Sequence, residues 1–162
     1  MTCTPTNRTR SVRSPSPPTE NTLRSCRSLS GWDIVGNCSP RSRARDRSER
    51  IVAERAGSIA GSVLLFPPAT DAYGAATASG DYPEVRLLAV APEARGHGIG
   101  AALMKECARR ARGAGAAALG LHTTDIMRAA VRMYERLGYV RTPEHDFVPA
   151  PGILIKGYRL DL

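Results

Sequence analysis

Residues 84–100 run Glu84-Val85-Arg86-Leu87-Leu88-Ala89-Val90-Ala91-Pro92-Glu93-Ala94-Arg95-Gly96-His97-Gly98-Ile99-Gly100 and decide the fold. The pattern predicts a buried strand, a short turn and a glycine-rich start to a helix. The first N–H groups of such a helix have no intrahelical partner, and the helix dipole adds partial positive charge there. The glycines allow close approach of the backbone and positive φ angles. The stretch therefore predicts a pocket for a phosphorylated ligand.

Two common phosphate-binding motifs fit this loop poorly. A Walker A loop ends in Gly-Lys-Ser/Thr, but here Ala101 and Ala102 follow the last glycine. A dinucleotide-binding fingerprint placed on residues 96–101 needs an acidic residue about 20 positions further on, at the end of the second strand. The next predicted strand ends at His122, and the first carboxylate after it is Asp125. Both motifs are disfavoured.

Two segments resemble one family. The segment Val90–Leu103 resembles the acyl-CoA-binding motif of GCN5-related N-acetyltransferases (GNAT), Arg/Gln-x-x-Gly-x-Gly/Ala, here Arg95-Gly96-His97-Gly98-Ile99-Gly100. The segment Ala129–Tyr139 is similar to the helix of that family that leads into tyrosine-x-x-leucine-glycine-phenylalanine. The two motifs come in the family's order, and the resemblance covers residues 50–162.

The resemblance implies an α/β fold with a GNAT-like mixed central sheet and flanking helices. Such domains usually begin with a strand and one or two helices that form one wall of the acceptor site. Residues 1–49 do not match these elements, so we expect them to be missing or replaced, with Leu23–Asp33 as the candidate substitute.

Transfer of an acetyl group from acetyl-CoA, as co-substrate, to a primary amine is the reaction that the resemblance implies. The amine attacks the thioester directly, and no metal takes part. The backbone of one strand would bind the pantetheine arm, and the loop would bind the pyrophosphate. The residues expected to bind acetyl-CoA are Leu88, Ala89, Val90, Arg95, Gly96, His97, Gly98, Ile99, Gly100 and Ala101.

Two residues are candidates for proton transfer. Tyr134 matches the family's tyrosine and is the candidate general acid, because a phenol keeps its proton at neutral pH. It could instead only fill the apolar stripe of its helix. Glu84 is the candidate general base, and burial is expected to raise its pKa. Its alternative role is an ion pair with Arg86. His122 is a rival base, and the position of His145 and Asp146 suggests contact with the acceptor.

One departure from the family concerns the segment ahead of the tyrosine helix. Many members carry an asparagine there that helps to hold CoA, but this chain has Thr124-Asp125-Ile126-Met127-Arg128. We therefore keep a second hypothesis, an acyl-CoA-binding module with weak or no catalysis. Small-molecule and peptide amines are both open as acceptors, and a homodimer is open as well.

Charge divides the chain into two parts. The whole chain has 23 Lys+Arg and 15 Asp+Glu. Residues 1–50 contain ten arginines and four acidic residues, which leaves 13 basic and 11 acidic residues in the remainder. We expect 1–49 to be a disordered Arg/Ser/Pro-rich segment and 50–162 to be the acyltransferase domain. The segment could be an arm that binds nucleic acid or an anionic surface, a solvated extension, or sequence outside the native coding frame.

Several other classes of protein are disfavoured. The first 30 residues have no apolar run typical of a signal peptide, and no segment approaches the length of a membrane span. The four cysteines lack metal-ligand spacing, which favours a cytoplasmic protein. Trp32 is the one aromatic residue in the arginine-rich segment, so binding to nucleic acid through stacked bases is not expected.

Apolar periodicity predicts alternating strands and helices in the domain. Along residues 84–91, alternate side chains are expected to share one face unless a bulge intervenes. The second helix is expected to start at an N-cap at Thr124 or Asp125 and to bury Ile126. The predicted strands cover 51–56, 58–66, 84–91, 116–122, 139–141 and 153–160, and the predicted helices lie at 99–112 and around 126–137.

Overall fold

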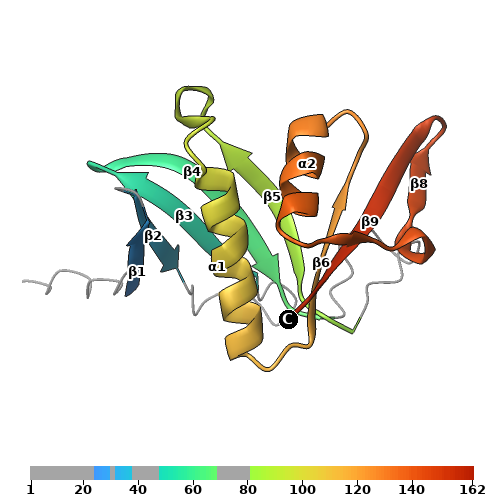
Figure 1. Ribbon diagram of the computed structural model, residues 1–162, viewed down its shortest axis with the longest axis horizontal. Coiled ribbons are helices and arrows are strands. Elements are labelled where there is room, and N and C mark those ends of the chain that lie inside the picture. Colours follow the sequence, from blue (N-terminus) through green and yellow to red (C-terminus); the bar gives the residue numbers. More distant parts are fainter. Residues whose placement is uncertain (1–23, 30–31, 38–47, 69–80) are drawn as a thin grey trace, which may run out of the picture.

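The computed structural model describes residues 24–29, 32–37, 48–68 and 81–162. Within them the strands follow one another across a mixed sheet in the order β1-β2-β3-β4-β5-β6-β9-β7, and β8 pairs with β9 (Figure 1). The strands are β1 (Arg24–Leu29), β2 (Trp32–Asn37), β3 (Glu49–Arg55), β4 (Ser58–Phe66), β5 (Glu84–Val90), β6 (Ala118–Thr123), β7 (Val140–Arg141), β8 (Phe147–Ala150) and β9 (Ile153–Asp161). The helices are the short η1 (Pro92–Ala94) and η2 (Pro143–His145) and the longer α1 (Ile99–Gly113) and α2 (Arg128–Arg136).

The expected α/β fold with a mixed central sheet is confirmed, and so are the predicted strands and helices at 99–112 and within 126–137. The short strand β8 was not predicted. The sheet is antiparallel from β1 to β5, parallel between β5 and β6, and antiparallel again between β6 and β9. A parallel pair needs a long crossover connection, and α1 supplies it.

Strands β5 and β6 are paired over a short length. Their register joins Glu84 to Gly120 and Val85 to Leu121 and goes no further. Beyond these pairs the two strands diverge toward their carboxyl ends (Figure 1). In open α/β sheets a ligand binds at such a place, outside the carboxyl ends of the strands.

A β-bulge interrupts β5 at the middle of the strand. Ser62 pairs with Ala89 and Leu64 pairs with Arg86, so two residues of β5 face one of β4. Leu87 has a φ of 53° and is 75% exposed. A bulge shifts the side chains that follow it to the other face. The face expected to be shared by residues 84, 86, 88 and 90 is therefore broken at this point.

Helix α1 covers one face of the sheet and forms the core with it. Its apolar stripe at Ile99, Leu103, Cys107 and Ala111 is buried, as the four-residue spacing predicts. On the strands the fully buried partners include Ile51 and Val63 on β3 and β4 and Leu119 on β6. Fully burying one such side chain contributes roughly 1.5–3 kcal/mol. This packing fixes the start of α1 at the end of β5.

Helix α2 begins later than its sequence suggests. Thr124 and Asp125 are not the N-cap, because the helix starts at Arg128 after the non-helical Met127. Ile126 is 92% exposed, so the prediction that it belongs to the buried stripe is wrong. The N–H of Met127 donates to the carbonyl of Thr124 over 3.0 Å, which closes a turn ahead of the helix. Tyr134 is the buried residue of α2, and the partly buried residues Ala130, Val131, Met133 and, at the C-cap, Leu137 pack against the core beside it.

The first 49 residues contain regular structure where they are described. β1 and β2 form an antiparallel hairpin, and β2 extends the sheet at the edge of β3. These strands occupy much of the candidate substitute segment Leu23–Asp33. These strands lie within the segment 1–49 for which disorder is expected, and residues 1–23, 30–31 and 38–47 of that segment lie outside the described residues.

Candidate functional site

The glycine-rich loop after β5 presents backbone N–H groups at the start of α1. Gly98 is the N-cap residue, and Gly96 and Gly98 both have a φ of +79°. A Cβ at either position would meet no atom within 4 Å, so it is the left-handed backbone that favours glycine there. The first N–H of α1 with an intrahelical partner belongs to Ala102, which donates to the carbonyl of Gly98 over 3.0 Å. The N–H groups before it are available to an anion.

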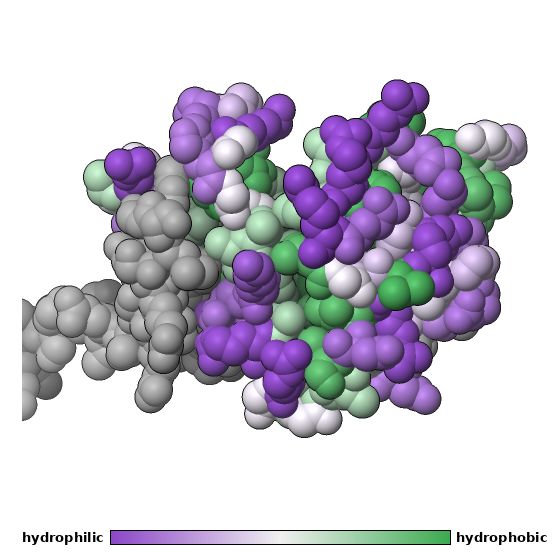
Figure 2. Space-filling view, in the orientation of Figure 1, coloured by the Kyte–Doolittle hydropathy of each residue, from purple (hydrophilic) through white to green (hydrophobic). Residues whose placement is uncertain are grey.

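Three elements meet beside this loop. A Cβ on Gly100 would lie 3.2 Å from the sulfur of Met133 on α2 and 3.7 Å from a side-chain carbon of Val90 on β5. The end of β5, the start of α1 and the side of α2 therefore converge at the diverging strands. Figure 2 shows the surface hollowed at the top between the loop and α2.

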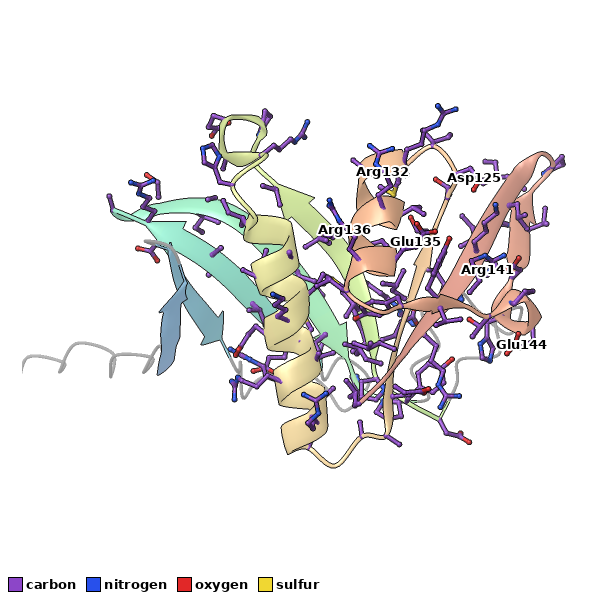
Figure 3. The ribbon with its side chains drawn as sticks, in the orientation of Figure 1. Asp125, Arg132, Glu135, Arg136, Arg141 and Glu144 are labelled. Carbon is purple, nitrogen blue, oxygen red and sulfur yellow. The ribbon has the colours of Figure 1, made fainter. Side chains whose placement is uncertain are left out.

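The predicted side chains of the loop are turned toward the protein's own backbone. The Nε of Arg95 donates to the carbonyl of Val90 over 3.2 Å, and the Nδ1 of His97 lies 2.9 Å from the carbonyl of Arg95. Both side chains are exposed. Positive charge on the other side of the hollow comes from α2, which carries Arg132 and Arg136, and Arg136 projects toward β5 (Figure 3).

A buried polar cluster lies at the base of the diverging strands. The Glu84 Oε2 accepts from the Arg86 Nη2 over 2.7 Å, and the Glu84 Oε1 lies 2.7 Å from the His122 Nδ1. Glu84 and Arg86 are 7% exposed. The Arg86 guanidinium also lies 4.4 Å from the centre of the Phe66 ring. The structure therefore brings together the two rival bases, Glu84 and His122, and the arginine predicted as a partner.

The direction expected for the pKa of Glu84 is wrong. Burial on its own would raise the pKa of this carboxyl, but the hydrogen bonds from His122 and Arg86 outweigh burial, and the pKa is lowered. Glu84 is therefore a carboxylate at neutral pH. The ion pair between Glu84 and Arg86, predicted as the alternative to a role of Glu84 as base, is present. It does not exclude that role.

Tyr134 is buried at the junction of α2 with the core. It is 7% exposed, its ring centre lies 5.9 Å from that of Tyr139, and burial raises its pKa. It therefore keeps its proton across the neutral range. The structure shows that Tyr134 fills the apolar stripe, and this packing leaves its proposed role as an acid open to test.

The two residues expected near the acceptor differ in their contacts. Asp146 accepts two hydrogen bonds of 2.8 Å from Arg141 and one of 2.9 Å from the N–H of Gly157, so it fastens η2 to β9. His145 lies over the buried cluster: its carbonyl faces the His122 Nε2 at 3.0 Å, and its Nδ1 is 3.1 Å from the Tyr82 hydroxyl.

Tyr82 and Phe147 are residues of this cluster that the sequence did not single out. Tyr82 lies against Gly120, where a Cβ would come within 2.5 Å of its ring. Phe147 meets the His122 ring edge to face at 5.4 Å between ring centres. For Tyr82 the sequence offers one signal, which is an aromatic residue two positions before the candidate base Glu84. For Phe147 it offers no local signal.

The described part of the chain contains neither a helix that could span a membrane nor a cluster of metal-ligating side chains. No helix there is long and apolar enough to cross a membrane. Groups of three or more His, Cys, Asp or Glu side chains placed to hold a metal ion are not found among the same residues.

Comparisons with solved structures place this architecture among acetyltransferases. A GNAT-family acetyltransferase from Desulfovibrio desulfuricans shares 24% identity, with a TM-score of 0.58 over 70% of this chain and 68% of that one. One from Elizabethkingia anophelis, with acetyl-CoA bound, shares 16% identity, with a TM-score of 0.61 over 83% and 100%. Nourseothricin acetyltransferase shares 28% identity, with a TM-score of 0.55 over 70% and 65%.

Among curated proteins the chain has no match. The family model for the acetyltransferase (GNAT) family matches residues 17–139, which include β1, the glycine-rich loop and all of α2. The matched region covers most of the chain and contains both motifs found in the sequence. This chain therefore belongs to the GNAT acetyltransferase family.

Proposed function

We propose that this protein transfers an acetyl group from acetyl-CoA to a primary amine. One observation carries the proposal: the N–H groups of the Gly96–Gly100 loop lie where β5 and β6 diverge, and a buried carboxylate lies at the base of the same strands. Family membership and the acetyl-CoA held by the Elizabethkingia anophelis protein support this assignment.

The loop is the proposed site for the pyrophosphate of acetyl-CoA. Its N–H groups and the dipole of α1 suit an anion, and nothing lies within 4 Å of the Cβ positions of Gly96 and Gly98. The backbone of Leu88, Ala89 and Val90, just after the bulge, would bind the pantetheine arm. A bulge leaves one residue of the ladder unpaired, and an N–H left unpaired in this way near Leu88 would suit the thioester oxygen.

Glu84 and Tyr134 are the proposed proton-transfer residues. The neutral amine attacks the thioester carbonyl carbon, so that a C–N bond forms and the C–S bond breaks. Glu84 accepts the proton that the amine nitrogen loses, directly or through a water molecule, and Tyr134 gives a proton to the departing thiolate. The lowered pKa of Glu84 and the raised pKa of Tyr134 put both groups in the required starting states.

The test is to follow thiol release from acetyl-CoA with a panel of amines. The panel includes polyamines, amino acids, peptides with free N-termini or lysines, and nourseothricin, because one similar structure is named for its acetylation. We expect thiol release with at least one amine, and mass spectrometry to find the acetylated product. Binding of acetyl-CoA without transfer to any amine would favour the binding-module hypothesis instead, and no binding would contradict both.

A further inference from the structure

The His122 ring lies between two oxygen atoms. Its Nδ1 is 2.7 Å from the Glu84 Oε1, and its Nε2 is 3.0 Å from the carbonyl oxygen of His145. A backbone carbonyl can only accept a hydrogen bond, and so can an ionised carboxylate. Both ring nitrogens must therefore donate for both bonds to form. In that state neither nitrogen has a lone pair that could take a proton from an amine.

Glu84 keeps room for a proton although both of its oxygens are bonded. Arg86 donates to Oε2 and His122 donates to Oε1, so the two donors hold opposite oxygens and fix the plane of the carboxylate. Each carboxylate oxygen has a second lone pair. The roles in the pair are thus unequal: the carboxylate can accept a further proton and the imidazole cannot.

The ring is itself held on several sides. Phe147 packs against it edge to face at 72°, and β6 lies between β5 and β9 in the sheet. The His145 carbonyl comes from η2, which the contacts of Arg141 and Asp146 fasten to β9. His122 therefore connects the strand that carries Glu84 to a loop on the far side of β6.

The other titratable or charged groups that face this cluster are Arg86 from β5, Glu144 and His145 from η2, Tyr82 from the segment ahead of β5, and Tyr158 and Arg159 from β9. Arg159 lies 5.5 Å from the centre of the Tyr82 ring. Burial is the main cause that raises the pKa of Tyr82, so this phenol stays neutral around neutral pH.

We propose that His122 is a positioning residue that holds the Glu84 carboxylate through its Nδ1–H, and that it is not the base. The inference rests on the proposed role of Glu84 in acetyl transfer. Glu84 and His122 are then not alternative bases, because the histidine positions the carboxylate and does not replace it.

Two substitutions of His122 by side-chain amides separate the hydrogen bond made by Nδ1 from the hydrogen bond made by Nε2. His122→Asn keeps a donor near the position of Nδ1 and loses the bond to His145, whereas His122→Gln keeps a donor near Nε2 and loses the bond to Glu84. In protein labelled with ¹³C at the glutamate carboxyls, NMR follows the titration of Glu84. Glu106 is the internal reference, since it is also buried and is paired with Arg109 and Arg110 on α1.

We expect His122→Gln to move the titration midpoint of Glu84 upward by about one pH unit, because burial still disfavours the charge while one stabilising donor is gone. His122→Asn should move the midpoint upward by less, because it keeps the donor to Glu84 and loses only the charge of the ring, and Glu106 should not move in either variant. Equal shifts in the two variants, or no shift in His122→Gln, would overturn the proposal. This readout needs no enzymatic activity, so it stands apart from a failure of the proposed function.

Two further measurements guard against variants that fail to fold or have no activity. In the wild-type protein the Nδ1–H proton of His122 should give a resolved resonance that exchanges slowly with solvent, and its absence would overturn the proposal. With an acceptor amine in hand, His122→Gln should lower kcat at least tenfold more than His122→Asn, with a similar KM for acetyl-CoA in both. Equal losses of kcat would make the role of His122 purely structural.

Discussion

The two ends of strand β5 contribute different kinds of group to the site: its carboxyl end contributes backbone and its amino end contributes side chains. Past the bulge, the site consists of backbone: glycines with φ of +79°, free N–H groups at the start of α1, and side chains exposed to solvent. Ahead of the bulge, it consists of side chains: the buried Glu84 and Arg86 and the partly buried His122 are joined by bonds of 2.7 Å. A backbone site tolerates changed side chains as long as its conformation survives, whereas a buried network is sensitive to the loss of one donor or charge.

The largest effect is expected at the side-chain end. Glu84→Gln should lower kcat by about 10²–10⁴-fold, the range for loss of a general acid or base, with acetyl-CoA binding retained. Steady-state kinetics and calorimetry measure the two quantities. Glu106→Gln is the matched control, because it also removes a buried, arginine-paired carboxylate but lies on α1 away from the strands' base. Equal losses of kcat in both variants would mean that Glu84 acts through stability alone.

Removing the Tyr134 hydroxyl is expected to have the next largest effect. Tyr134→Phe should lower kcat by about 10²-fold, at the lower end of the range for a general acid, because a thiol is acidic enough to leave with little help. Tyr139→Phe, which changes a neighbouring buried tyrosine, is the control. If both variants keep wild-type kcat, Tyr134 only fills the apolar stripe of α2.

The pH dependence of kcat offers a second view of Tyr134. A general acid works while it is protonated, so its contribution is lost as the pH rises through its pKa. Because burial raises the pKa of Tyr134 above 10.0, the wild-type kcat should show no fall assigned to this residue below pH 10. A fall near pH 8 that disappears in Tyr134→Phe would contradict this assignment.

A smaller effect is expected at the backbone end. Gly98→Val should weaken acetyl-CoA binding about tenfold, because a left-handed conformation costs a non-glycine residue roughly 1–2 kcal/mol and the loop must shift to relieve it. Gly115→Val introduces similar strain at the opposite end of α1, where φ is +82° and a Cβ would also meet nothing within 4 Å. Calorimetry should find nearly wild-type binding in this control, and equal weakening in both variants would count against the loop.

The smallest effect is expected for an exposed side chain of the loop. His97→Ala should change the Kd for acetyl-CoA less than about twofold, since its ring bonds to the carbonyl of Arg95 and the ligand is expected on the backbone N–H groups. Arg95→Ala is the comparison, because that guanidinium can pair with a phosphate after leaving the carbonyl of Val90. A larger loss of acetyl-CoA affinity in His97→Ala than in Arg95→Ala would show that side chains, and not the backbone, bind the ligand at this end of β5.

The contrast also explains what could be predicted from the sequence. The loop was predictable because glycine spacing and the apolar stripe of α1 are local signals, four residues or fewer apart. The bulge at Leu87 was not, since it depends on the register against β4. The direction of the pKa of Glu84 was missed because its decisive donor, His122, is 38 residues away on β6. The start of α2 was misplaced because the turn at 124–127 imitates a helix in its apolar spacing.

The most direct test of the central claim is a calorimetric titration of acetyl-CoA into the full-length protein, with circular dichroism to show that the protein is folded. We predict saturable binding at one site that weakens in Gly98→Val and persists in Glu84→Gln. A folded wild-type protein that binds no acetyl-CoA would contradict the assignment of the Gly96–Gly100 loop and, with it, the proposed acetyl transfer.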